Sequence, residues 1–413
     1  MRSRARRICV TGLNARNLFH AINEHAISLM NYYVGLVEFE PGEYEEMDWE
    51  ILRILRKERI HFQQGNKERL YMARAQLGHG LTNVVFKSER MLLAMDGFLE
   101  ERKDSCRRKA AILAVERERA AHLGTIRRYL EEKYSLGVVE MKALVEKQKE
   151  TLDGKTDAKC LHRKVLRTLK DSLVDARASS LWMTHGHLSP QEEAMLCYVQ
   201  DRNVFFGELN AMCGYCGKER KTVDHIATQC EKLRDYEYLW RHNEVVKSIH
   251  LLYCSRFGAV KCTRCGAHKV ESIVENSRVC IKADMHIRTD LKLCHNRPDI
   301  LVHDKARNEM TIVEVGITSL ERLQEVEIAK ARKYGPLAAE LKRIYGCKVS
   351  MIPYVMTWDG IVTPYHMKYQ KEIGIPRSVE AYIQTVALRR TAASMVASRG
   401  RTAAQCLPLA VHE

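Results

Sequence analysis

Two acidic residues lie beside two short apolar runs, where they could hold a divalent metal ion together. Asp299 precedes the apolar run 300–302, and Glu314 follows the β-branched run 311–313, with a polar turn at 303–309 between them. If the turn closes midway, the two acids lie opposite each other. Carboxylate oxygens are ligands that Mg²⁺ takes, at about 2.0–2.1 Å, and such an ion would serve metal-assisted phosphodiester cleavage. The alternative is a pair of surface acids on an ordinary hairpin.

A lysine would complete such a site by countering the negative charge that develops on a reacting phosphate. In the common nuclease arrangement it lies two residues beyond the second acid, where this sequence has Gly316. The sequence offers Lys330 and Lys333 instead, followed directly by Tyr334. On a helix these three residues share one face. A helix that packs across the hairpin could therefore direct them at the acids.

An upstream cluster of cysteines and one histidine has the spacing of a structural zinc site. Cys213, Cys216, His225 and Cys230 are separated by two, eight and four residues. Three thiolates and one imidazole complete a tetrahedral zinc, and the two-residue gap lets the first two cysteines bind one ion. Four protein ligands leave no open position for chemistry, so the expected zinc is structural. Chance spacing of buried thiols is the alternative.

A second pair of cysteines, Cys262 and Cys265, is less informative. His268 and Cys280 follow it as further candidate ligands, but the spacing matches no metal-binding pattern, so ordinary reduced cysteines are the preferred interpretation. The other cysteines among the 14 are dispersed, and the basic N-terminus has too short an apolar stretch for a secretory signal. Together these features favour a reducing compartment.

The elements that must position the acids form an α/β unit late in the chain. Residues 277–290 alternate apolar and polar side chains at strand period. The two runs beside the acids follow as strands, and a helix over roughly 319–345 and a strand over 348–360 complete the unit. Up to about residue 205, charged and apolar residues interleave at helical spacing, as in the segment 107–134.

The charge balance points to a polyanionic partner. Lysine and arginine outnumber the acids 67 to 52, for a net charge of +15, and such a field attracts nucleic acid first of all. Many basic proteins bind nothing in particular, so charge alone leaves both readings open. The composition is that of a soluble globular protein, and no apolar run is long enough to cross a membrane.

Several segments together resemble a known family. "IKADMHIRTDLKLCHNRPDILVHD", "EVGI" and "KARKYGPL" resemble the restriction-like endonuclease domain of site-specific non-LTR retrotransposon polyproteins, of the PD-(D/E)xK nuclease superfamily, with the lysine moved onto the following helix. The upstream cysteine and histidine cluster, followed by "RHNEVVKSIH", has that family's order. The segment from "NYYVGLVEF" to "LGHGL" is similar to the thumb of these polyproteins, with His79 where an arginine is expected.

The resemblance implies a multidomain α plus α/β protein with a mostly helical N-terminal half. The expected regions are a reverse-transcriptase thumb-like region at 1–90, a helical linker at 91–205, a CCHC zinc knuckle and following helix at 206–260, a PD-(D/E)xK restriction-endonuclease-like α/β core at 268–375, and a tail at 376–413 that begins helical and ends basic and flexible. No Asp-Asp pair of a polymerase palm occurs. The chain is therefore expected to be the C-terminal part, or a truncated copy, of a longer polyprotein, without polymerase activity of its own.

The resemblance also assigns roles by position. Asp299 and Glu314 are the expected magnesium ligands. The expected catalytic residues are these two acids together with a lysine, for which Lys330 is the first choice and Lys333 the second. The zinc ligands are those named above. Candidate nucleic-acid contacts are Arg241, His242, Arg107, Arg108, Arg127 and Arg128. For Arg241 and His242, DNA contact and helix packing are equally good explanations. For the other arginines, a position on a solvated helix face is almost as good an explanation as nucleic-acid binding.

The expected activity is Mg²⁺-dependent nicking of target DNA, whose released 3′ end primes reverse transcription in this family. The expected partners are target DNA, the RNA of the element and the polymerase part of the same polyprotein, in the nucleus, with no membrane and no small-molecule cofactor. The alternative is a catalytically idle nucleic-acid-binding remnant. Whether the side chains of Asp299, Glu314 and Lys330 converge discriminates between the two.

Overall fold

The computed structural model describes the chain except for residues 38, 102–106, 209, 260–264 and 400–413. Its contacts divide the chain into two compact units. The first unit comprises Met1–Arg167 and His187–Asp201, and the second comprises Thr168–Gly186 and Arg202–Glu413. The contacts thus separate two units rather than the five expected regions, and the assignment of those regions to functions stays a prediction.

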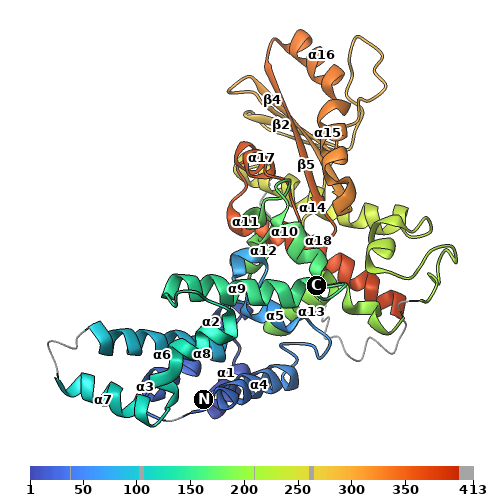
Figure 1. The fold of residues 1–413 in the computed structure, drawn as a ribbon. Coiled ribbons are helices and arrows are strands. Elements are labelled where there is room, and N and C mark those ends of the chain that lie inside the picture. Colours follow the sequence, from blue (N-terminus) through green and yellow to red (C-terminus); the bar gives the residue numbers. More distant parts are fainter. Residues whose placement is uncertain (38, 102–106, 209, 260–264, 400–413) are drawn as a thin grey trace. The chain divides into compact units, whose positions relative to one another are not determined.

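The first unit is helical, as the sequence predicts (Figure 1). Its α-helices are α1 (Arg2–Cys9), α2 (Ala15–His25), α3 (Met30–Tyr33), α4 (Pro41–Lys57), α5 (Lys67–Tyr71), α6 (Val84–Glu101), α7 (Arg107–Glu118), α8 (His122–Tyr134), α9 (Met141–Asp157) and α13 (Pro190–Gln200), and α10 (Arg163–Lys170) spans the division between the units. Helix α4 begins at Pro41 because Glu40 and Glu43 cap its first turn reciprocally. Apolar faces of these helices, including Leu18, Ile22 and Leu52, form the core.

Buried ion pairs join the two segments of the first unit. Arg69 donates to Asp201 Oδ1 at 2.8 Å with both side chains buried. His79 Nδ1 lies 2.8 Å from Glu193 Oε1, and Arg74 contacts the same carboxylate. Burial lowers the pKa of His79, although the hydrogen bond to Glu193 opposes this. His79 is therefore an internal residue, which explains why an imidazole is tolerated in "LGHGL".

The second unit contains one mixed five-stranded sheet. In sheet order its strands are β1 (Ile273–Glu275), β2 (Val279–Ala283), β3 (Ile300–Asp304), β4 (Glu309–Thr318) and β5 (Lys348–Thr357). The first four strands are antiparallel in sequence order, and β5 is parallel to β4. A parallel neighbour requires a crossover, which helices α15 (Leu323–Lys333) and α16 (Gly335–Tyr345) provide. Strand β5 lies at the edge, where Pro353 is tolerated.

Local backbone chemistry moves two boundaries away from those expected. The strand expected over 277–290 ends at Ala283, because Asp284 adopts a positive φ of 47° and its N–H donates to Asp299 O at 3.1 Å. The single helix expected over 319–345 is two helices, because the chain turns at Tyr334 and Pro336 occupies the first turn of α16, where proline is favoured.

Helices α15 and α16 pack against the sheet, and further helices complete the second unit (Figure 1). They are α11 (Ala176–Ser179), α12 (Leu181–Thr184), α14 (Arg234–Arg256), α17 (His366–Ile373) and α18 (Arg377–Arg399). Leu301 and Ile312 of the sheet pack against Leu337 and Leu341 of α16. Helix α18 confirms that the tail begins helical, and its expected flexible end lies outside the described residues. In the part of the chain that is described, no helix has both the length and the apolar composition to cross a membrane.

Candidate active site and metal centre

The β3–β4 hairpin places the two acids next to each other. Ile300 pairs with Val313, so Asp299, one residue before β3, falls opposite Glu314. Side chains alternate along a strand, which puts both acids on the face that also holds Leu301 and Ile312. The N–H of Asp299 lies 3.4 Å from Glu314 Oε2. Glu314 is 1% exposed, so this is a buried carboxylate and not a surface acid.

Two lysines of α15 contact the buried carboxylate. Lys330 Nζ lies 2.7 Å and Lys333 Nζ 2.8 Å from Glu314 Oε1. A buried carboxylate without partners is costly, so these ammonium groups account for its burial. Burial would lower the pKa of Lys333, but the hydrogen bond and charge of Glu314 outweigh this and raise it. The structure thus brings together all four side chains that the sequence assigns to catalysis.

Tyr334 lies beside the lysines, with Lys333 Nζ 4.7 Å from the centre of its ring. Its hydroxyl donates to the carbonyl oxygen of Arg297 at 2.6 Å, because α15 ends at Lys333 and Tyr334 lies in the turn between two helices. The tyrosine therefore tethers the segment that leads to Asp299.

Helix α14 adds a residue that the sequence placed elsewhere. His242 Nε2 lies 3.1 Å from Asp299 Oδ2, and the N–H of Val315 donates to the same oxygen at 2.7 Å. Burial would raise the pKa of Asp299, but the hydrogen bond and charge of His242, with smaller contributions from Val315 and Lys330, lower it. In the same way burial opposes, but Asp299 raises, the pKa of His242. His242 is therefore a partner of the acid pair.

A glycine explains how the lysines reach the acids. A Cβ added at Gly316 would lie 3.2 Å from Val355 Cγ2 and 3.3 Å from Val326 Cγ1. Val326 belongs to α15, one turn before Lys330. A side chain at the position where a lysine commonly stands would therefore press on α15, the helix that carries Lys330 and Lys333.

We expect Gly316→Val to lower the free energy of unfolding of the chain by about 1–3 kcal/mol, the usual cost of overpacking. Denaturant unfolding measures this. Gly335→Val is the matched control, since a Cβ at Gly335 meets nothing within 4 Å. Equal unfolding midpoints for the two variants would contradict the close packing of α15 on β4.

The His242–Asp299 pair makes a pH-dependent contribution to stability. A histidine with a raised pKa stabilises the fold below its unfolded pKa and loses that contribution as pH rises through the folded pKa. An aspartate with a lowered pKa contributes above its unfolded pKa. The pair is thus at full strength between about pH 4 and about pH 6.5.

In NMR titration of the metal-free chain we therefore expect the His242 ring to titrate above about pH 6.5, and Asp299→Asn to bring its pKa down. His303, whose pKa burial lowers, is the internal reference. A His242 pKa at or below that of His303 would show that the pair does not form.

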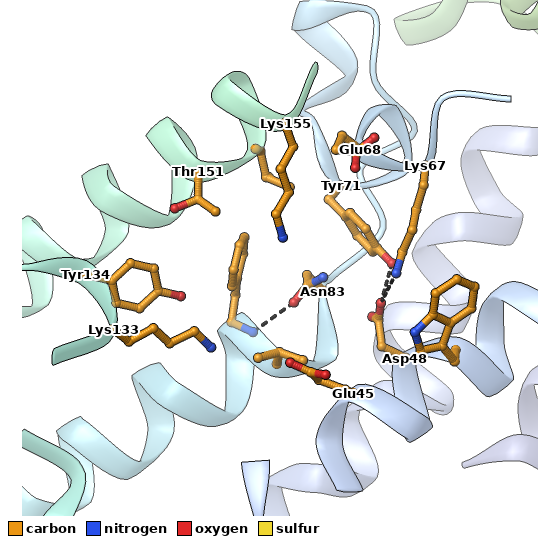
Figure 2. A pocket seen from close by; sticks show the side chains of 14 residues that line it. Glu45, Asp48, Lys67, Glu68, Tyr71, Asn83, Lys133, Tyr134, Thr151 and Lys155 are labelled. Atoms are coloured by element: carbon orange, nitrogen blue, oxygen red, sulfur yellow. Dashed lines mark hydrogen bonds and ion pairs between the residues drawn. The ribbon is translucent and has the colours of Figure 1, made fainter. Parts of the chain in front are cut away.

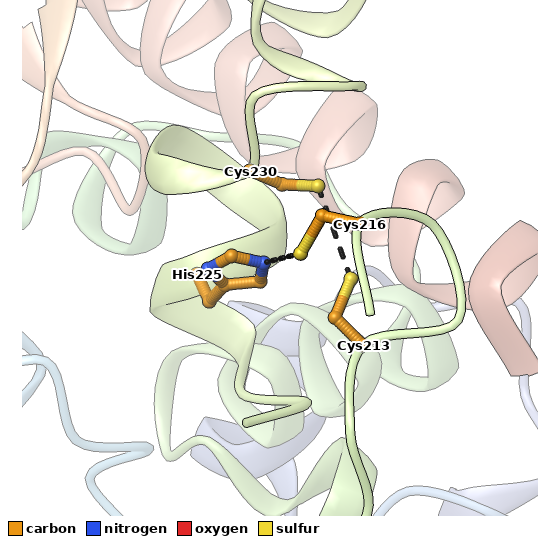
Figure 3. Close-up of side chains that lie close together, drawn as sticks. All are labelled: Cys213, Cys216, His225 and Cys230. Atoms are coloured by element: carbon orange, nitrogen blue, oxygen red, sulfur yellow. Dashed lines mark hydrogen bonds between the residues drawn. The ribbon is translucent and has the colours of Figure 1, made fainter. Parts of the chain in front are cut away.

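The four predicted zinc ligands converge in the second unit (Figure 3). Their ligand atoms all lie within 4.8 Å of one another. Cys213 Sγ lies 3.8 Å from Cys230 Sγ, and Cys216 Sγ lies 3.4 Å from His225 Nε2. Zinc–sulfur bonds of about 2.3 Å in a tetrahedron set two sulfurs about 3.8 Å apart. The cluster could therefore bind a metal such as zinc.

Local turns position these ligands. Gly217 has a φ of +65° and its N–H donates to Cys213 O at 2.8 Å, which closes the turn between the first two cysteines. A π-helical turn, His225–Gln229, holds the histidine and leads to Cys230. Hydrogen bonds from the backbone of Lys218 and Glu219 lower the pKa of Cys216 to about 6. This favours the thiolate that a metal requires.

Arg241 packs inside the second unit. It is fully buried and donates to the carbonyl oxygen of Ala227 in the π-helical turn. Burial lowers its pKa to about 10. Of the two alternatives weighed for this residue, its burial favours helix packing over DNA contact. Arg241 thereby connects the turn of the metal cluster to α14, one residue before His242.

The arginines expected to bind nucleic acid in the helical half have different surroundings. Arg127 donates to Asp96 Oδ2 at 2.6 Å, in an ion pair with a buried carboxylate. Arg128 is exposed. The side chains of Arg107 and Arg108 lie outside the described residues. Arg128 is thus the one among the four whose described surroundings match a solvent-facing cation.

A pocket of about 270 Å³ lies in the first unit (Figure 2). Its lining includes Lys67, Lys133 and Lys155 together with Asp48 and Glu68. Lys67 Nζ lies 3.5 Å from Asp48 Oδ2. The mixed charges give the pocket no basic character, so it does not extend the expected nucleic-acid surface.

Comparison with known proteins identifies no relative: neither a protein-family model nor a curated protein matches this chain. A functional assignment therefore depends on the chemistry of the site.

Proposed function

We propose that the second unit is a Mg²⁺-dependent DNA endonuclease that nicks one strand. The observation that supports this is the meeting of Asp299, Glu314, Lys330 and Lys333, which come from a strand entry, a strand interior and a helix. The buried Glu314 and the partly buried Asp299 lie beside two ammonium groups and the imidazole of His242. Core packing does not require such a polar centre. The resemblance of the same segments to PD-(D/E)xK endonucleases of non-LTR retrotransposons gives this centre its chemistry.

The donor set fits a hard divalent cation. Asp299 and Glu314 would hold it through oxygen atoms, as Mg²⁺ prefers. When bound, the ion polarises a phosphate and lowers the pKa of its water. Lys330 and Lys333 would bind the phosphate oxygens, to which they offer charge-assisted hydrogen bonds, and His242 would hold Asp299 in place. Target DNA, element RNA, the polymerase part of a polyprotein and a nuclear location are proposed with this function.

We further propose that the cluster of Cys213, Cys216, His225 and Cys230 binds a structural zinc. The sulfur separation of 3.8 Å between Cys213 and Cys230 supports this. Three residues separate Cys230 from the start of α14 at Arg234. The ion would therefore fix the beginning of the helix that presents His242.

The second candidate is a catalytically idle nucleic-acid-binding remnant. One observation favours it: both acids already have internal partners, two lysine ammonium groups on Glu314 and the imidazole of His242 on Asp299. A remnant would keep such a neutralised centre as a structural feature, and the net charge of +15 would still attract nucleic acid.

A nicking assay on supercoiled plasmid tests the proposal. The purified chain is incubated at low salt, because phosphate-driven binding weakens steeply with ionic strength, with Mg²⁺ or with a chelator. Nicking that needs Mg²⁺ is the expected result. DNA binding in a mobility-shift assay without nicking at any Mg²⁺ concentration would overturn the endonuclease and leave the remnant.

A further inference from the structure

A second group of metal-type ligands lies in the second unit, apart from the cluster of four. His250 and Cys254 are four residues apart on α14, so they share one face of the helix. His268 lies in the chain beyond α14, where its N–H donates to Cys265 O at 3.1 Å. The three ligand atoms all lie within 4.8 Å of one another. A helix and a turn thus bring two imidazoles and a thiol to one point.

The contacts within this group are those of ligand atoms that face one another. His250 Nδ1 lies 2.8 Å from His268 Nε2 and 3.5 Å from Cys254 Sγ. His250 and Cys254 have no exposed surface, and His268 is 6% exposed. Ordinary core positions hold apolar side chains, and placing three polar, metal-binding groups together there needs a reason.

The types of ligand in the group suit a metal. Zinc accepts imidazole nitrogens and cysteine sulfur as ligands. His250 also has a hydrogen bond to the backbone of Glu271. A ring that ligates a metal through one nitrogen commonly bonds a backbone group through the other, and the contact with Glu271 fits that pattern.

We propose that His250, Cys254 and His268 bind a transition-metal ion of the zinc class, at a second site distinct from the cluster of four. Three protein ligands leave one coordination position open to water or another donor. Cys265 is not one of the three, since its Sγ contacts Ser248 Oγ at 3.4 Å. Cys280 is a free thiol outside the group, and Cys262 lies outside the described residues.

The metal content of the full chain, purified with zinc in the medium and measured by elemental mass spectrometry, tests this site. With both sites filled the wild type holds two zinc ions per chain. His268→Ala is expected to lose one equivalent, and Cys265→Ser, the matched control, none. Adding Cys216→Ala to His268→Ala should remove the second equivalent, which separates the two sites.

The outcomes distinguish this inference from the proposed zinc in the cluster of four. If that cluster bound no zinc, the wild type would hold one ion, lost in His268→Ala but not in Cys216→Ala. Should His268→Ala fail to fold, His268→Cys, which keeps a ligand, is compared with His268→Asn, which does not. Metal retained by His268→Cys alone supports the site, and equal metal in wild type, His268→Ala and His268→Asn overturns it.

Discussion

Lys330→Ala is expected to reduce Mg²⁺-dependent plasmid nicking by about 10²–10³-fold, the usual effect of removing one group that stabilises charge in a transition state. The fold should survive the change, because Lys333 Nζ remains 2.8 Å from Glu314 Oε1 and still compensates the buried charge. Loss of activity with unchanged unfolding would therefore report a chemical role. Initial nicking rates and denaturant unfolding of the same samples measure both quantities.

Lys333→Ala is the matched variant, since both lysines contact the same carboxylate oxygen. A larger loss of nicking in Lys333→Ala than in Lys330→Ala would make Lys333 the more important active-site lysine. Asp299→Asn should abolish nicking, whereas Glu309→Gln, at the partly exposed start of β4, should leave it intact. If both Lys330→Ala and Asp299→Asn nicked DNA as fast as the wild type, these residues would not form the active site.

Cys230→Ser is expected to release the ion from the cluster of four and to destabilise the second unit by about 4 kcal/mol or more, as the loss of a structural metal does. Cys230 is fully buried and faces Cys213 at 3.8 Å. Its loss removes a thiolate from a four-ligand site and leaves the remaining ligands buried without their ion. Thermal unfolding with parallel zinc measurement detects both effects.

Cys294→Ser is the control for this variant, because Cys294 is an exposed free thiol in the same unit. The two cysteine variants should differ in metal content by one equivalent and in unfolding temperature by several degrees. Stability of Cys230→Ser equal to that of Cys294→Ser would mean that the four side chains pack without a metal.

The sequence predicted much of the hairpin because its signals are local. Two β-branched runs and a polar turn determine which residues pair, and the pairing puts Asp299 opposite Glu314. The three-residue spacing of Lys330 and Lys333 determines their shared helix face. The position of Glu314 inside a buried strand was also predictable, because it depends on the neighbouring β-branched run alone. What the local signals could not show was that α15 passes close enough for both lysines to bind one oxygen.

Features that depend on distant contacts were missed. His242 precedes Asp299 by 57 residues, and the strand pattern around Asp299 contains no trace of this contact. The spacing of Cys262 and Cys265 made His268 a candidate ligand, but it gave no indication that His250 and Cys254 lie beside His268. Strand β1 is only three residues long, too short for an alternating pattern. The turn at Tyr334 was not predicted, because the residues of α15 and α16 follow one helical periodicity and the sequence pattern reads as a single helix.

Helix α14 connects the cluster of four, the acid centre and the second group of ligands. It begins four residues after Cys230 and contains His242, His250 and Cys254 within 23 residues. At a rise of about 1.5 Å per residue, His242 and His250 lie about 12 Å apart along its axis. If both proposed ions bind, they would hold α14 near each end, and binding of either ion would be linked to protonation of His242 in so far as it changes the position of the helix. Such a coupling would be reciprocal, so the supply of metal would then influence the acid centre that contains His242.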